Sequence, residues 1–197
     1  MMKTLINIRG ACGSGKTEAV RQWCRKNNFH VEYVEISHGS LPISITDRAI
    51  VIGDYEKTAN CTGTDALRCG GKACGKLDLC ELIRAICKKY NPECIIYEHM
   101  LSSQICQYTM DVAKSAQDYG YSYMGIQLWT DDDTRLRNLR NRSGTKAKTK
   151  NFIQNGKNVN RATELLREKG YNIVKVCTTD IEKENMWRIV ENAVQKA

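Results

Sequence analysis

The sequence of 197 residues contains no apolar run that approaches the roughly 20 residues that a membrane-spanning helix requires. Residues 1–4 lead directly into an apolar stretch and show none of the parts of a secretory signal peptide. Internal repeats, low-complexity tracts and linker-like segments are also absent. We therefore expect a soluble, cytoplasmic, single-domain protein that covers residues 1–197 and has no membrane partner.

The 10 cysteines lack the C-x2-C spacing that is typical of a zinc site. Without an export signal, they are expected to be reduced thiols rather than disulfides. Cys61, Cys69, Cys74 and Cys80 are close together in a segment rich in Gly and Lys. A structural zinc ion there is the less favoured interpretation, and a loop with incidental thiols is preferred.

Apolar residues follow strand-like and helix-like patterns in alternation along the chain. Strands are predicted at residues 5–8, 30–36, 49–53, 94–97, 124–129 and 173–177. Helices are predicted at residues 17–24, 79–90, 104–119, 131–141, 158–169 and 181–195. Such alternation predicts an α/β fold, a three-layer sandwich with a mainly parallel central sheet and helices on both faces.

A glycine-rich segment joins the first predicted strand to the first predicted helix. Its sequence, GACGSGKT at residues 10–17, matches the P-loop motif G-x-x-x-x-G-K-[ST] in full. Backbone N–H groups of residues 13–16 are expected to ring the β-phosphate of ATP, with Lys16 bridging the β- and γ-phosphates and Thr17 ligating Mg²⁺. The predicted nucleotide-binding residues are Gly10, Cys12, Gly13, Ser14, Gly15, Lys16 and Thr17.

The rest of the sequence excludes several classes of P-loop protein. It lacks the N-K-x-D motif by which a GTPase selects guanine, and it is too short for a large motor or AAA-type ATPase. Basic residues outnumber acidic ones by 30 to 22, for a net charge of +8. A dense basic block follows three aspartates in the segment at residues 131–150 and consists of Arg135, Arg137, Arg140, Arg142, Lys146, Lys148 and Lys150.

This block favours a kinase with a P-loop kinase-like fold and a mobile basic lid. We predict that Arg140 and Arg142 reach the γ-phosphate, because they are nearest to Gly144 at the expected break. The alternative is a solvated helix whose charges suit its own macrodipole.

A polar loop follows the strand predicted at residues 49–53. Ligands of doubly wound sheets bind beyond the carboxyl ends of the strands, so Tyr55, Lys57 and Asp65 are predicted to bind substrate. Asp65 is a candidate general base for the attacking hydroxyl, or else the N-cap of a helix that begins near residue 66. Tyr55 either stacks on a base or packs against the sheet edge.

The stretch CIIYEHM, at residues 94–100, is an apolar strand that ends in an acid, the usual form of a Walker-B element. Glu98 is therefore predicted to hold Mg²⁺ through water or to orient the nucleophile, and it joins Lys16, Asp65, Arg140 and Arg142 as a catalytic candidate. If the strand continues, His99 points to the opposite side from Glu98, and it is left without a role.

The succession of GACGSGKT, IGDYEKTANCTGTDAL, IIYEHMLSS and the arginine-rich segment resembles the bacteriophage P-loop kinases that act on 5-hydroxymethyluracil in DNA. The resemblance covers the chain up to about residue 170. The chain departs from the family pattern in three places: the Cys-Thr-Gly-Thr-Asp sequence at residues 61–65, an apparent insertion at residues 69–76, and His99 in place of a more usual glycine.

The resemblance implies an ATP-dependent kinase that phosphorylates the hydroxymethyl group of this base, as a step in DNA base hypermodification in the host-cell cytoplasm. Its partner would be DNA with a modified pyrimidine, whose base must leave the stack to reach the γ-phosphate. The net charge of +8 suits such a polymeric phosphate substrate. Two alternatives stay open: a small-molecule nucleoside or nucleotide kinase, and a P-loop regulatory or DNA-binding ATPase that phosphorylates no acceptor.

Overall fold

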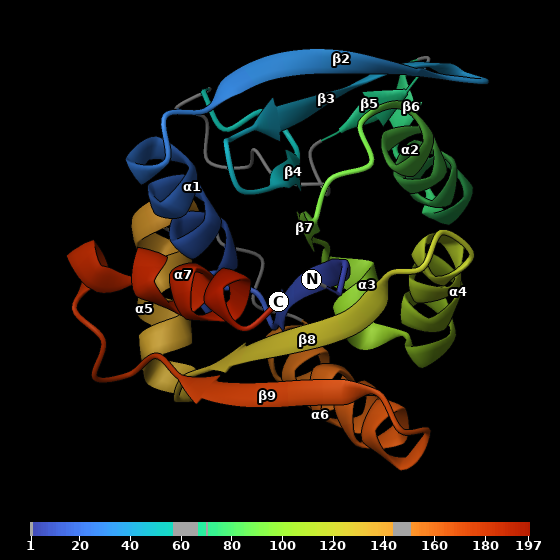
Figure 1. Ribbon diagram of the computed structural model, residues 1–197. Coiled ribbons are helices and arrows are strands. Elements are labelled where there is room, and N and C mark those ends of the chain that lie inside the picture. The colour runs from blue at the N-terminus through green and yellow to red at the C-terminus, as the bar shows by residue number, and fades with distance from the viewer. Residues whose placement is uncertain (1, 57–66, 70, 144–150) are drawn as a thin grey trace.

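The computed structural model describes residues 2–56, 67–69, 71–143 and 151–197, without the side chains of residues 142 and 143. Its main sheet has seven strands in the order β2–β3–β4–β7–β1–β8–β9 (Figure 1). These strands are β1 (Thr4–Gly10), β2 (His30–Ile36), β3 (Gly39–Ile45), β4 (Ile50–Ile52), β7 (Cys94–Glu98), β8 (Ser122–Trp129) and β9 (Asn172–Cys177). A separate two-stranded sheet consists of β5 (Arg68–Cys69) and β6 (Lys72–Ala73).

Helices cover both faces of the main sheet (Figure 1). One face packs against α1 (Lys16–Lys26) and α7 (Trp187–Gln195). The other face packs against α2 (Lys76–Lys89), α4 (Cys106–Gln117) and α6 (Phe152–Glu168). Two more helices, α3 (Met100–Gln104) and α5 (Asp132–Ser143), follow the carboxyl ends of β7 and β8. The central strand β1 pairs in parallel with β7 and β8, and the expected mainly parallel α/β sandwich is confirmed.

The core of the molecule is divided by the sheet, because successive side chains of a strand point to opposite faces. Ile6 and Ile8 of β1 pack with Val20 and Trp23 of α1, and all four side chains are fully buried. Leu5 of β1 belongs to the core of the other face, with residues of α2 and α4. Every residue of β1 is buried, so the loop that follows it starts from a rigid strand.

Strand β3 is missing from the sequence-based prediction, and it makes one end of the sheet antiparallel, through β2–β3 and β3–β4 pairing. The sequence-based prediction missed this strand because it contains Pro42, and proline has no N–H to donate to a neighbouring strand. The missing donor is replaced locally. Pro42 still accepts a bond from the Gly53 N–H (3.1 Å), while the Gly53 carbonyl accepts the Ser44 hydroxyl (2.9 Å).

Several helix boundaries also differ from those predicted. The helix expected at residues 104–119 is α4, which begins at Cys106 because Ile105 adopts an extended backbone, and the short helix α3 before it was not predicted. The helix expected at residues 181–195 is a 3₁₀ turn at Lys183–Asn185 followed by α7. In the part of the chain that the structure describes, no helix combines the length and apolar character that crossing a membrane would demand.

Candidate active site

The P-loop connects β1 to α1, as the motif predicts. Gly13 (φ 82°) and Gly15 (φ 92°) adopt left-handed backbone conformations that favour glycine. A Cβ atom on Gly13 would lie 2.5 Å from the carbonyl oxygen of Arg135, so a side chain has no room there. The loop is therefore a backbone cradle at the N-terminus of α1, where free N–H groups and the helix dipole favour an anion. This geometry fits the polyphosphate of a nucleotide.

Lys16 is the first residue of α1 and is nearly buried. Its ammonium group donates hydrogen bonds to the carbonyl oxygens of Gly10 (2.9 Å) and Ala11 (3.2 Å). The lysine therefore spans its own loop and holds a positive charge at the cradle.

Glu98, at the end of β7, lies beside the start of α1. Its Oε2 atom accepts a hydrogen bond from the Thr17 hydroxyl (3.0 Å), and its Oε1 atom accepts one from the Tyr55 hydroxyl (3.1 Å). Glu98 as a whole is 3% exposed. Hydroxyl and carboxylate oxygens are the ligands that Mg²⁺ prefers, so Thr17 and Glu98 fit the ion that the P-loop motif implies. The structure thus brings together the two residues predicted to bind metal.

The position of Tyr55 bears on the two alternatives of the sequence analysis, stacking on a base or packing against the sheet. Its side chain is fully buried in the core on the α1 face and points to Glu98 rather than to solvent. Burial, together with the nearby Glu98 carboxylate, raises the pKa of Tyr55 well above its usual value, so the phenol stays a neutral donor. The ring has no exposed surface on which a base could stack, so the structure shows the packed alternative, with the hydroxyl bonded to Glu98.

Helix α5 covers the P-loop through a residue that the sequence analysis did not assign to the site. Arg135 is 5% exposed, and its Nε atom donates to the carbonyl of Cys12 (3.3 Å). Its other nitrogens donate to Asp132 Oδ1 (2.6 Å) and to the carbonyl of Phe152 (3.2 Å). Asn138 of the same helix donates to the Gly13 carbonyl (2.9 Å). The i, i+3 spacing of Asp132 and Arg135 was visible in the sequence, but the contact with the loop was not.

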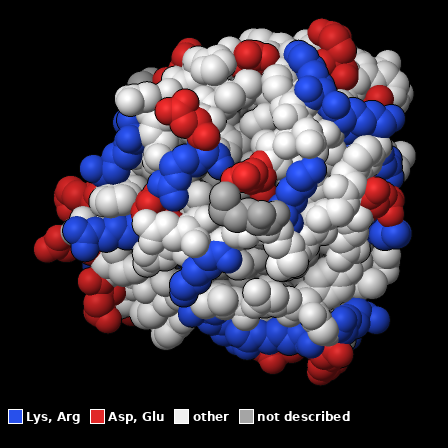
Figure 2. Space-filling view, viewed as in Figure 1, with Lys and Arg blue, Asp and Glu red and all other residues white. Residues whose placement is uncertain are grey.

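Arg140 lies further along α5 and is exposed. The side chain of Arg142, and the whole of Lys57, Asp65, Lys146, Lys148 and Lys150, lie outside the described residues. Their predicted roles stay predictions. Figure 2 shows basic side chains interspersed with acidic ones over the described part of one face, in several groups rather than one continuous patch.

Cys69, Cys74 and Cys80 are buried in the core on the α2 side. Burial raises the pKa of the Cys74 thiol to about 12, which disfavours the thiolate that binds metal. Cys61 lies outside the described residues, and the residues that are described contain no group of three His, Cys, Asp or Glu side chains placed to hold a metal.

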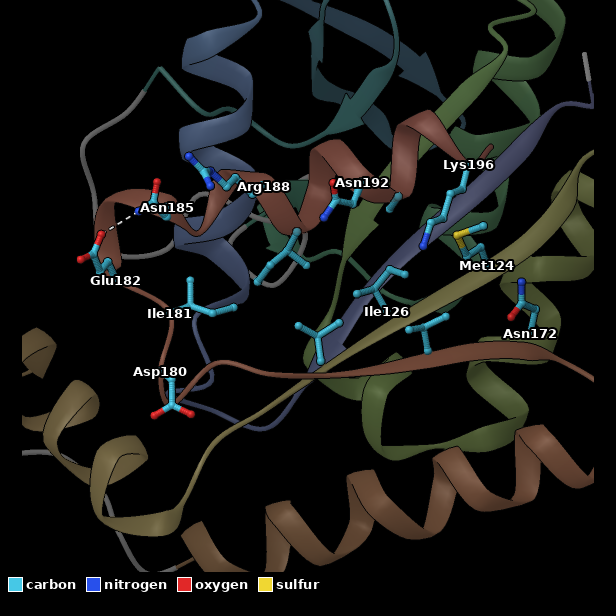
Figure 3. Close-up of a pocket in the computed structure, with 14 residues that line it drawn as sticks. Met124, Ile126, Asn172, Asp180, Ile181, Glu182, Asn185, Arg188, Asn192 and Lys196 are labelled. Carbon is cyan, nitrogen blue, oxygen red and sulfur yellow. Dashed lines mark hydrogen bonds between the residues drawn. The ribbon is translucent and has the colours of Figure 1, made fainter.

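The cavities on the described surface include two near these strands and helices. One, of about 510 Å³, adjoins the P-loop and is lined by Ser14, Trp129, Arg135 and Lys157, among others. A larger one, of about 750 Å³, lies between α7 and the strands β8 and β9, where Lys196 reaches toward Met124 and Ile126 (Figure 3). The larger cavity contains none of the predicted site residues, so we place the candidate site at the P-loop.

Comparisons with known proteins identify no family for this chain. A scan against protein-family models finds no match. A search of curated proteins finds no relative. Solved structures similar to this chain include a deoxyadenosine kinase from M. mycoides with bound dATP, at 12% identity and a TM-score of 0.44, covering 98% of this chain and 100% of that one.

An uncharacterised protein from Eubacterium ventriosum is similar at 12% identity and a TM-score of 0.46, covering 99% of both chains. A de novo designed protein of P-loop NTPase fold is similar at 12% identity and a TM-score of 0.41, covering 99% of this chain and 92% of that one.

Proposed function

We propose that the chain is an ATP-dependent P-loop phosphotransferase. The observation that carries the proposal is the meeting of Lys16, Thr17 and Glu98 at the carboxyl ends of β1 and β7, with the Thr17 hydroxyl 3.0 Å from Glu98 Oε2. A complete P-loop motif and an acid-ended strand come from segments that are far apart in the sequence. Their convergence supports one site rather than two chance patterns.

In this proposal the cradle N–H groups and Lys16 bind the β- and γ-phosphates, and Lys16 releases the carbonyl oxygens of Gly10 and Ala11 to do so. Thr17 and Glu98 would hold Mg²⁺, which neutralises phosphate charge when bound. Tyr55 keeps the Glu98 carboxylate oriented through its hydrogen bond. The 510 Å³ cavity beside the loop offers room for the rest of the nucleotide.

We further propose that the acceptor is the hydroxymethyl group of 5-hydroxymethyluracil in DNA. The resemblance of the motifs to the phage kinases supports this acceptor, as does the net charge of +8. Asp65 would accept the proton of the attacking hydroxyl, and Lys57 would contact the substrate. Arg140 and Arg142, in the proposed lid at residues 131–150, would stabilise charge on the transferring phosphoryl group.

The test is incubation with γ-labelled ATP, Mg²⁺ and three acceptors: DNA containing 5-hydroxymethyluracil, ordinary DNA of the same sequence, and free nucleosides. We expect label in the modified DNA only. Label in the free nucleosides instead would mean that the acceptor is a small molecule and not DNA. Release of inorganic phosphate with all acceptors unlabelled would contradict the kinase proposal and favour a regulatory ATPase.

The salt dependence of acceptor binding gives an independent test of DNA. Each contact between a basic residue and a phosphate releases counterions, so affinity for modified DNA should fall by orders of magnitude between about 50 and 200 mM salt. Replacing Lys146, Lys148 and Lys150 with glutamine together should flatten this dependence. A flat profile in the unchanged protein would remove DNA from the proposal.

A further inference from the structure

Arg9 is a fully buried residue of β1 that directly precedes the first glycine of the P-loop. Its guanidinium donates to the Thr109 hydroxyl (3.0 Å), the Tyr123 hydroxyl (3.4 Å) and the Ser103 carbonyl (3.1 Å). No ion pair in the described part of the chain includes Arg9. A buried charge without a carboxylate is costly, and an apolar side chain would fill the space with less penalty. The contacts of Arg9 therefore point to a role beyond packing.

Ser103 of α3 is the point where these contacts converge. Its hydroxyl is fully buried, accepts a hydrogen bond from the Gly10 N–H (3.3 Å) and donates one to the His99 carbonyl (2.8 Å). Its own carbonyl accepts the Arg9 guanidinium. One serine thus links the first glycine of the P-loop to the residue that follows Glu98.

The bonds to Ser103 connect the ends of β1 and β7 beyond the last residues that the two strands pair. The parallel register of β1 and β7 ends at the pair Ile8 and Glu98. Beyond that pair, β1 runs into the P-loop while the chain after Glu98 turns into α3. The bonds from Arg9 and Gly10 to Ser103 connect the two segments across this divergence.

Helix α3 depends on such contacts, because five residues are too few to form a stable helix alone. Thr109 donates to the Ser102 carbonyl and accepts the Arg9 guanidinium, so α3 is held from the α4 side as well. His99 caps the helix by accepting the Ser102 N–H at its Nδ1 atom (3.2 Å), and its ring stacks on Tyr108. The turn after Glu98 is thereby fixed against the base of the P-loop.

We infer that Arg9 and Ser103 are positioning residues that set the placement of Glu98 relative to the P-loop. The inference rests on the proposed phosphotransferase function. Residues that orient a metal ligand from outside its contact shell change metal affinity or activity by about 10- to 100-fold when removed. Loss of Ser103 should therefore impair use of Mg²⁺, while the P-loop itself still binds nucleotide.

The decisive variant is Ser103→Ala, with Ser102→Ala as its matched control. Both serines are fully buried in α3 and both hydroxyls donate to the His99 carbonyl, but Ser103 is the one bonded to Gly10. We expect Ser103→Ala to lower kcat by about tenfold or more and to leave the affinity for metal-free ATP within about threefold. Ser102→Ala should change kcat by less than about twofold.

Two further measurements do not depend on turnover. The gain in ATP affinity on adding Mg²⁺, measured by calorimetry, should shrink in Ser103→Ala and persist in Ser102→Ala. Hydrogen exchange at residues 100–104 should accelerate more in Ser103→Ala than in the control. Equal behaviour of the two variants in these measurements, or an equal loss of metal-free ATP binding and kcat in Ser103→Ala, would overturn the inference.

These readouts separate the inference from the function on which it rests. A wild-type protein that binds ATP but phosphorylates no acceptor would refute the proposed function, and the Mg²⁺ effect on affinity would still decide the role of Ser103. Arg9→Lys adds a test of mechanism, since it keeps the charge and loses the forked geometry. We expect Arg9→Lys to resemble Ser103→Ala, and full activity in that variant would show that Arg9 acts by charge and not by position.

Discussion

The two faces of β1 are held in place by different kinds of interaction. On the α1 face, Ile6 and Ile8 pack in an apolar core. On the α4 face, Asn7 and Arg9 are just as buried, but they make hydrogen bonds to Tyr123, Thr109 and α3. Apolar contacts are non-directional and supply stability, whereas a network of buried hydrogen bonds fixes atoms in one arrangement.

The same division continues at the end of β7, where consecutive residues go to opposite faces. Glu98 meets Thr17 and Tyr55 on the α1 face, and His99 stacks on Tyr108 on the α4 face. The chemistry of the proposed site is thus on the apolar face, and the contacts that orient it come from the polar one. Substitutions on the two faces should therefore impair different properties of the protein.

Among substitutions that compare the two faces, the largest effect is expected from Glu98→Gln, which removes the charge that fits a metal ion while preserving the shape of the side chain. Turnover should fall by about 10²-fold or more, because the carboxylate that would hold Mg²⁺ loses its charge. Steady-state phosphoryl transfer from labelled ATP measures this. Glu93→Gln is the control, since Glu93 is exposed just before the other end of β7, and the two variants showing equal turnover would exclude Glu98 from the chemistry.

Ile8→Ala should break the apolar face without touching the polar one. Deleting a fully buried isoleucine side chain costs about 2–5 kcal/mol of unfolding free energy, from lost transfer energy and the cavity that remains. Denaturant unfolding measures the loss. Ile153→Ala, at a position that is 60% exposed, should stay within about 0.5 kcal/mol of the parent. A loss below about 1 kcal/mol in Ile8→Ala would mean that this core is less tightly packed than the structure shows.

Tyr123→Phe should produce the smallest change, on the polar face. The hydroxyl accepts bonds from Asn7 (3.1 Å) and Arg9 (3.4 Å), and its removal leaves buried donors without that acceptor. The expected loss is about 1–3 kcal/mol of unfolding free energy. The exposed Tyr33 provides the control in Tyr33→Phe, and indistinguishable unfolding curves for the two variants would remove Tyr123 from the network.

The P-loop and the acid-ended strand were predictable because each is a local pattern that carries its own chemistry. Residues 10–17 specify a strand–loop–helix connection, and an apolar run ending in Glu98 specifies a buried strand with a carboxylate at its tip. Neither inference requires knowledge of what lies elsewhere in the fold. The mainly parallel sheet followed from strand–helix alternation for the same reason.

The features that escaped prediction depend on partners that are distant in the sequence. Arg9 bonds to residues 94 and 100 positions further along, so its polar surroundings do not show in its own segment. Tyr55 was predicted to be a loop residue because it follows the end of a strand. In the structure it lies in the core, where its hydroxyl donates to Glu98. Strand β3 escaped prediction for a local reason instead, because Pro42 has no N–H to donate and the Ser44 hydroxyl bonds to the Gly53 carbonyl in its place.

The central claim is that the P-loop of this chain transfers the γ-phosphate of ATP, and Lys16→Ala tests it most directly. The measurement is the rate of phosphoryl transfer from γ-labelled ATP to DNA containing 5-hydroxymethyluracil, for the wild type and the variant, with matching circular dichroism spectra as the check on folding. We predict transfer by the wild type and a loss of at least about 10²- to 10³-fold in the variant. Substantial transfer by a folded Lys16→Ala protein would contradict the account.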